Sequence, residues 1–132
     1  QERLRIYRRI SHFKYQEQIP MLYEELIDRF GPPPQTMLTF LNLQRVTLLA
    51  KAIGIFEIFV EKYELFITLH VETRLTESMM TAVLNLPDSP FTKVAGDRLC
   101  FTLTTDQRRQ VEQTTAQALL YFYDRLPKQS VL

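Results

Sequence analysis

The stretch that most constrains this chain is residues 23–34, which read YEELIDRFGPPP. At about 100° per residue, a helix here collects its apolar side chains on one arc. These are Leu22, Tyr23, Leu26, Ile27 and Phe30. The opposite arc is acidic and carries Glu24, Glu25 and Asp28. Gly31 allows a left-handed end and Pro32 lacks the N–H that would continue the helix, so the pattern predicts a helix ending at Phe30.

Length and composition limit the class of protein. The chain has 132 residues, and 45% of them are hydrophobic, which fits one soluble globular domain over residues 1–132. No apolar run approaches the roughly 20 residues of a membrane span, and the single Cys100 forms no internal disulfide, so we expect a cytoplasmic setting. The net charge of +1 gives no bulk attraction to nucleic acid. The chain starts without Met and already in helical pattern, which we interpret as a piece of a longer protein.

Three helices are predicted before residue 55. Residues 2–15 have an apolar face and a basic face, the latter formed by Arg5, Arg8, Arg9 and His12. A second helix follows a polar break at residues 16–19, with Pro20 in its first turn. Pro34 is suited to open a third helix, whose apolar residues recur at spacings of three, four and seven until Gly54 ends it. They are Leu38, Leu41, Leu48, Leu49, Ala52 and Ile53.

Beyond Gly54 the apolar period changes towards two, which predicts strands. Residues 55–60 and 65–71 form one expected antiparallel hairpin, and residues 91–95 and 98–103 form a second one around Gly96 and Asp97. A short connecting helix is expected from Thr76 to Leu84, and a capping box at Thr104 and Gln107 starts a long C-terminal helix that packs on the sheet. The predicted fold class is therefore α+β.

Three segments resemble a known family in order and spacing. They are LRIYRRI at residues 4–10, ELIDRFGP at residues 25–32 and AKAIGI at residues 50–55. Together they closely resemble the C-terminal domain of bacterial transcription-repair coupling factors (Mfd). The match covers the first 55 residues; beyond them the likeness is one of pattern only. The triple proline at residues 32–34 is heavier than the one or two prolines usual in the family.

Catalytic and cofactor chemistry finds no support in the sequence. The three glycines, at positions 31, 54 and 96, stand too far apart to form a phosphate-binding loop. His12 and His70 have no partners at metal-ligand spacing, and Cys100 alternates with apolar residues like a packing or surface thiol. We therefore expect no enzyme, no cofactor, no metal and no small-molecule ligand. An enzyme that depends on Glu25 or Cys100 is the weakest of the hypotheses.

Two surfaces remain as candidates for a function. The residues predicted to contact a partner protein are Glu24, Glu25, Asp28 and Arg29 on the second helix. Glu25 and Asp28, three apart, suit the paired N–H groups of arginines on that partner. The alternative is a nucleic-acid contact through the basic first helix, since phosphate binding needs only clustered cations.

The resemblance implies a specific role for the acidic helix. In the family, this domain folds against a UvrB-like module of the same chain and covers the surface that recruits the repair ATPase UvrA. It thereby also restrains an ATP-dependent DNA translocase until RNA polymerase is engaged. The resemblance thus implies an autoinhibitory domain, in which RNA polymerase and DNA are contacted only by the rest of the parent protein.

Overall fold

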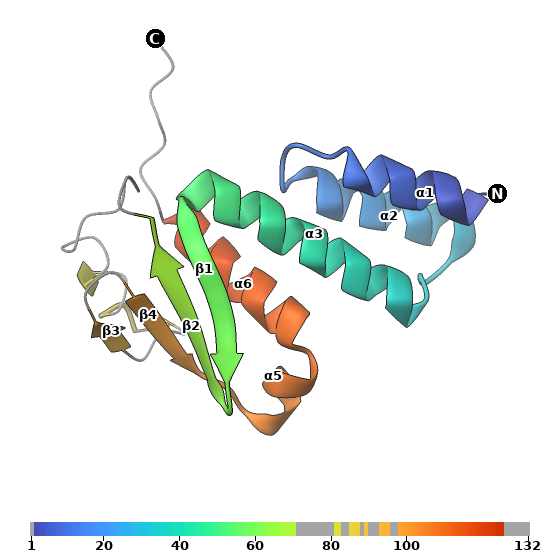
Figure 1. The fold of residues 1–132 in the computed structure, drawn as a ribbon. Coiled ribbons are helices and arrows are strands. Elements are labelled where there is room, and N and C mark those ends of the chain that lie inside the picture. The colour runs from blue at the N-terminus through green and yellow to red at the C-terminus, as the bar shows by residue number, and fades with distance from the viewer. Residues whose placement is uncertain are drawn as a thin grey trace, which may run out of the picture.

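The computed structural model describes residues 2–70, 81–82, 85–87, 89, 93–95 and 98–125. Three helices come first: α1 (Glu2–Ser11), α2 (Gln18–Phe30) and α3 (Gln35–Ile53). They are followed by the strands β1 (Ile55–Glu61), β2 (Glu64–Leu69), β3 (Lys93–Ala95) and β4 (Arg98–Thr102), and by the helices α5 (Thr105–Arg109) and α6 (Val111–Asp124). Figure 1 shows this α+β order, which confirms the predicted fold class.

The ends of the first three helices follow from local chemistry. Gly31 stops α2 with a φ of +82°, and its N–H donates to the carbonyl of Ile27. Gly54 stops α3 in the left-handed conformation, and Pro34 immediately precedes that helix. These boundaries confirm the predicted ones. Helix α1 ends at Ser11, four residues before the predicted end at Tyr15, because the chain turns there to reach α2.

The strands form a four-stranded antiparallel sheet in the order β1-β2-β4-β3. The β1–β2 hairpin closes over the two residues Lys62 and Tyr63, and Lys62 has a φ of +56°. Strand β2 alternates as predicted, with Leu65, Ile67 and Leu69 buried on one face. The first predicted hairpin is therefore present. Strands β3 and β4 pair antiparallel as predicted for the second, whose turn at Gly96 and Asp97 lies outside the described residues. The pairing of β2 with β4 joins the two pairs of strands.

The C-terminal helical segment starts as predicted but is not continuous. Thr104 and Gln107 form a reciprocal capping box, in which the Gln107 amide N–H donates to Thr104 Oγ1 at 3.1 Å. The segment is interrupted at Gln110, which has non-helical angles between α5 and α6. Helix α6 then lies on the sheet, with Ala118, Leu119 and Phe122 buried. The helix predicted from Thr76 to Leu84 lies outside the described residues except for residues 81 and 82, which are helical.

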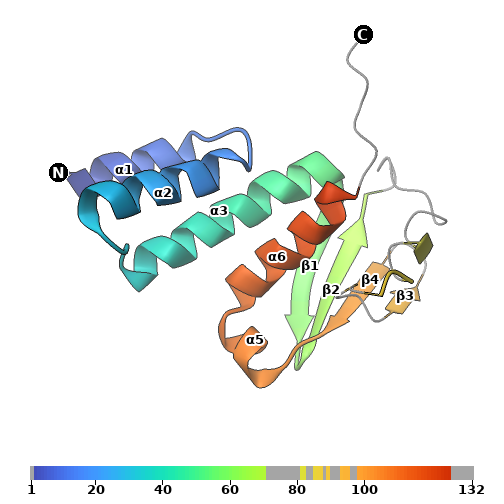
Figure 2. The same ribbon diagram turned by 180° about the vertical axis from the view of Figure 1, so that it is seen from behind.

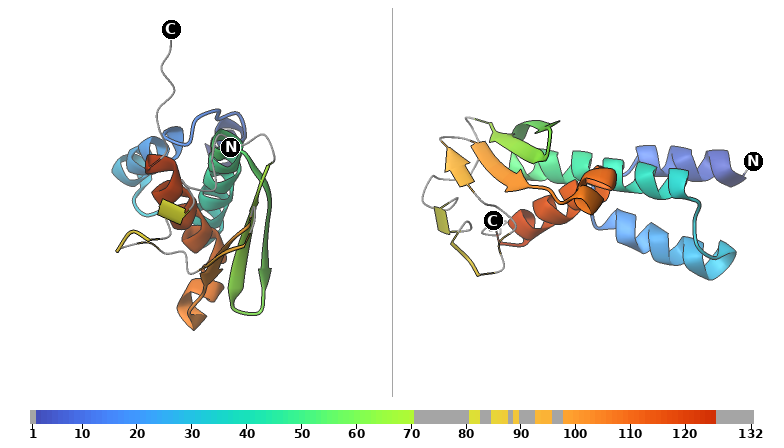
Figure 3. Two further views of the ribbon diagram at one scale, coloured as in Figure 1. Left: turned by 90° about the vertical axis from the view of Figure 1, so that its left-hand side faces the viewer. Right: turned by 90° about the horizontal axis from the view of Figure 1, so that it is seen from below.

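Two buried clusters share helix α3. The sheet cluster joins the buried face of β2 and β4 to α6 and to Leu49 and Ile53 of α3. The helical cluster joins α1 and α2 to Met37, Leu41 and Leu48 of α3. Its buried members are Ile10, Ile19, Leu22, Leu26, Met37, Leu41 and Leu48. Figure 3 shows α1 and α2 at one end of the molecule and the sheet at the other, with α3 running through both.

Candidate functional site: the outer face of α2

Helix α2 buries a narrower arc than its sequence predicts. Leu22 and Leu26 are buried, whereas Tyr23 and Ile27 are each 38% exposed and Phe30 is 55% exposed. The prediction of one wide buried arc is therefore wrong for Tyr23, Ile27 and Phe30. The physical reason is that α1 and α3 cover only one flank of α2, so the flank with Tyr23 and Ile27 stays open to solvent.

The middle of the solvent face carries two acidic residues. Glu24 and Asp28 are exposed, and neither forms an ion pair with any residue that the structure describes. Met21, which is 69% exposed, lies on the same face one turn before Glu24. We call the surface formed by Met21, Tyr23, Glu24, Ile27 and Asp28 the α2 ridge. It combines two free carboxylates with apolar side chains on both sides of them.

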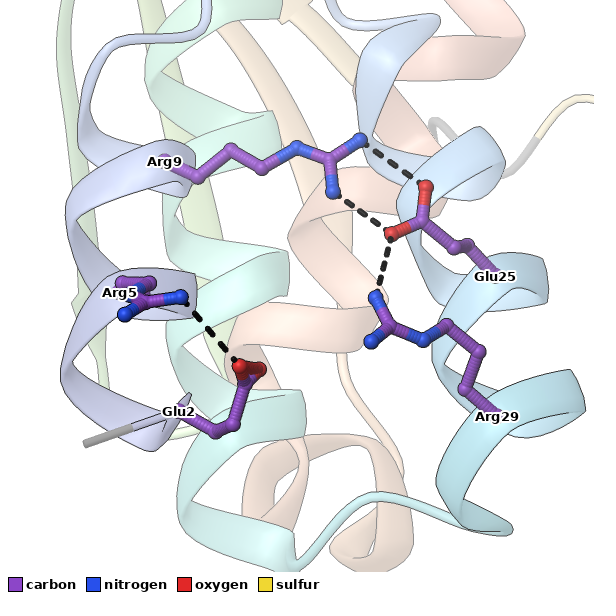
Figure 4. Close-up of polar contacts among 5 residues, drawn as sticks. All are labelled: Glu2, Arg5, Arg9, Glu25 and Arg29. Carbon is purple, nitrogen blue, oxygen red and sulfur yellow. Dashed lines mark hydrogen bonds and ion pairs between the residues drawn. The ribbon is translucent and has the colours of Figure 1, made fainter.

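Glu25 has a different role from its two acidic neighbours. Its carboxylate accepts hydrogen bonds from both terminal nitrogens of Arg9 on α1, at 2.7 and 3.0 Å. Figure 4 shows this two-point contact between the helices, with Arg29 of α2 also directed at Glu25 Oε2, 3.9 Å away. Glu25 is therefore already paired within the domain, and the structure does not group it with Glu24 and Asp28.

The contact shifts the pKa values of both Glu25 and Arg9. The hydrogen bond from Arg9 lowers the pKa of Glu25 below its ordinary value of 4.5, although partial burial opposes the effect. The same bond raises the pKa of Arg9. Both groups are thus held in their charged forms. The pair links α1 to α2 along a partly exposed flank, while Glu24 and Asp28 face solvent.

The basic face of α1 is partly neutralised. Arg9 is paired with Glu25, and Arg5 lies 3.6 Å from Glu2. The Nδ1 atom of His12 is hydrogen-bonded to the carbonyl oxygen of Arg8 at 2.7 Å. Among the described residues, the Arg8 side chain forms no ion pair. Of the three arginines in the predicted basic face, Arg8 is therefore the one outside an ion pair among the described residues.

The other candidates for chemistry do not come together in the described part of the chain. Cys100 is buried in β4. His12 lies beside α1 and His70 follows β2, so the two histidines are on different parts of the fold. The described residues hold no group of three or more His, Cys, Asp or Glu side chains suited to a metal ion. In the same residues, no helix has the length and apolar character to cross a membrane.

Comparison with known proteins identifies the family of this chain. The model of the TRCF domain matches residues 1–80, which is more than half of the chain. The chain belongs to the TRCF domain family. A comparison with curated proteins finds no match. Among solved structures, the chain resembles one described as the crystal structure of the C-terminal domain of transcription-repair coupling factor.

That structural likeness extends over nearly the whole of this chain. It covers 93% of this chain and 82% of the other, with a TM-score of 0.60 and 19% sequence identity. At this identity the likeness shows the fold and not the partners. It does show that the fold continues beyond residue 80, where the family model stops and where the sequence resembles the family only in pattern.

Sequence reasoning missed the split among the three acidic residues of α2. The helical arc places Glu24, Glu25 and Asp28 together, and nothing in the spacing says which of them a neighbouring helix will reach. A signal was available in retrospect, because α1 and α2 are each amphipathic and joined by a short loop, so their charged edges had to meet. Arg9 and Glu25 occupy those edges.

Proposed function

We propose that this TRCF domain is an autoinhibitory protein-interaction domain of a transcription-repair coupling factor. In this proposal the α2 ridge lies on the UvrB-like module of the same parent chain and covers the surface through which that module recruits UvrA. The domain itself makes and breaks no covalent bond. The parent protein is an ATP-dependent DNA translocase, and it is the rest of that protein which contacts DNA and RNA polymerase.

One observation carries this proposal: Glu24 and Asp28 are exposed, unpaired within the described chain and bordered by exposed apolar side chains. Carboxylates of this kind accept the paired N–H groups of arginine guanidinium forks. Met and Tyr are among the residue types enriched in protein interfaces, and Met21 and Tyr23 lie beside the acidic pair. The ridge therefore suits a partner surface with arginines around an apolar centre.

A moderate interface is sufficient for this role. Two modules tethered in one chain meet at effective concentrations that reach the millimolar range, so weak intrinsic affinity keeps them mostly closed. A switch must also open, and coupling between sites is typically about 1–3 kcal/mol. Two solvent-exposed carboxylates and a small apolar border fit this range better than a large buried interface does.

The experiment compares two kinds of charge change on α2. Glu24→Lys together with Asp28→Lys should weaken binding of the domain to the UvrB-like module at least tenfold in calorimetry. In the full parent protein, the same pair should raise both UvrA binding and basal ATPase activity. The matched control is Glu25→Gln, which removes a carboxylate that Arg9 already holds, and it should leave affinity for the module much closer to wild type. Unchanged UvrA binding and unchanged ATPase activity in the double variant would refute the proposal.

The alternative function, a nucleic-acid contact through α1, has weaker support. Arg5 and Arg9 are engaged with carboxylates, and phosphate contacts would have to compete with those pairs. Filter binding of the domain at low salt measures this directly. Salt-sensitive binding that Arg8→Gln reduces would favour the alternative.

A further inference from the structure

A groove of about 670 Å³ lies on the side of α2 that faces away from α1. Helix α3 forms its floor, while α2 forms one wall and the α5–α6 segment forms the other. Figure 2 views the molecule from this side, with α3 running between α2 and α6. The α2 wall is made by Ile19, Pro20 and Tyr23, so the groove begins at the edge of the α2 ridge. Its volume falls in the range of sites that hold a ligand or a short segment of a partner.

Carboxamide side chains dominate the polar lining. Gln35 and Asn42 contribute from α3, and Gln113 and Gln117 contribute from α6. Within the described chain, the side chains of Asn42, Gln113 and Gln117 make no hydrogen bond. Each carboxamide offers both a donor and an acceptor, as a peptide unit does. A lining of this kind on two sides suits the backbone of an extended polypeptide, whose N–H and C=O groups point outward in alternation.

One cation in the groove has unused hydrogen-bonding capacity. Arg45 is half-buried, and its Nε donates to Gln16 Oε1 at 2.8 Å. Burial lowers the pKa of Arg45, while the charges of Asp124 and Glu17 act in the opposite direction. Neither carboxylate forms an ion pair with it, and no other described residue does. A half-buried guanidinium without an ion pair favours an incoming carboxylate, because its two terminal nitrogens bind both oxygens together.

We propose that this groove binds an extended polypeptide segment carrying an acidic side chain, with the backbone between α3 and α6 and the carboxylate on Arg45. A nucleic-acid strand fits less well, because Glu112 lines the same groove and Arg109 lies 3.9 Å from Asp106. Leu38 and Leu120 supply apolar contact for one neighbouring side chain of the segment. The proposal does not depend on what the α2 ridge binds.

The test selects linear peptides from a random display library on the intact 132-residue chain. The selected peptides should share an acidic position, and changing that residue to its amide should weaken binding about tenfold. Arg45→Gln should weaken the parent peptide by a similar factor and should have little effect on the amide peptide. This non-additivity in a double-mutant cycle identifies a direct contact between the two groups.

Three further variants keep the test decisive. Gln117→Trp fills the groove from an exposed position and should abolish binding. Arg45→Lys keeps the charge and should preserve part of the preference for the acidic peptide over its amide. A retained preference shows that the variant is folded and that the charge at position 45 is what the peptide recognises. Arg5→Gln removes the same charge from α1, outside the groove, and should change nothing. Failure to select any peptide, or selected peptides whose binding survives Gln117→Trp, would overturn the proposal.

Discussion

The two buried clusters on α3 predict that the domain opens in two steps. Leu22 in α2 and Leu119 in α6 form a matched pair, because each side chain is 1% exposed and each belongs to a different cluster. Leu22→Ala should loosen α1, α2 and the side of α3 that carries Met37 and Leu41. Leu119→Ala should loosen the sheet and α6 instead. Local stability of this kind differs between cooperative units of one domain.

The size of the effect follows from the burial of the two leucines. Each substitution removes three carbon atoms from a closed site, and Leu→Ala changes in cores cost about 2–5 kcal/mol. Taking about 3 kcal/mol, the opening equilibrium of the affected unit shifts by a factor of about 150, since 1.4 kcal/mol is tenfold. Equal burial of the two side chains makes the expected costs comparable, so the contrast lies in where each variant acts.

Native-state hydrogen exchange measures this contrast amide by amide. In Leu22→Ala, exchange should accelerate about 150-fold in α1 and α2 while the strands β2 and β4 keep their protection. Leu119→Ala should give the reverse pattern. If both variants accelerated the same amides by the same factor, the domain would unfold as one unit and the two-cluster interpretation would be wrong.

Three further predictions concern single groups. The pKa of Glu25 is lowered by Arg9, so this pair contributes fully to stability above the ordinary Glu pKa of 4.5. Its contribution is lost as pH falls through the lowered value. The difference in melting temperature between wild type and Glu25→Gln should therefore be constant above about pH 6 and shrink in acid. A difference that grew in acid would contradict this. Gly31→Ala should cost about 1–3 kcal/mol in urea unfolding, because φ is +82° while an added Cβ meets nothing within 4 Å, so only backbone strain acts; a neutral result would show that the turn relaxes. Thr104→Ala should cost about 1 kcal/mol through loss of the capping box, with Thr104→Ser as the control that keeps the hydroxyl.

Local signals predicted most of the fold. The helix ends at Gly31 and Gly54 depend on backbone conformation at one residue, and the alternation of β2 depends on a period of two, so both can be seen in the sequence. The capping box at Thr104 is equally local. The interruption at Gln110 was not predictable in this way, because residue types on both sides of it continue a helical pattern and the geometry of the α5–α6 segment decides where it turns.

The candidate site depended on contacts that the sequence does not specify. The acidic residues of α2 were predictable as a group, whereas the pairing of Glu25 with Arg9 joins positions sixteen residues apart on two helices. The exposure of Tyr23 and Ile27 depends on which flank of α2 the rest of the domain covers. The groove between α2 and α6 requires the fold of the whole chain, since its two walls come from opposite ends of the sequence.

The Arg9–Glu25 pair connects stability to the proposed function through orientation. Leu22 and Leu26 fix which face of α2 is buried, and a small rotation of the helix about its axis would turn Glu24 and Asp28 out of register with a partner. A two-point contact on one flank opposes that rotation, because both oxygens of Glu25 must stay on the Arg9 fork. Glu25, which the partner does not use, therefore helps to hold the direction in which Glu24 and Asp28 point. This predicts that Arg9→Met should lower affinity for the UvrB-like module less than the reversal of Glu24 and Asp28 does, and chiefly through a slower association rate.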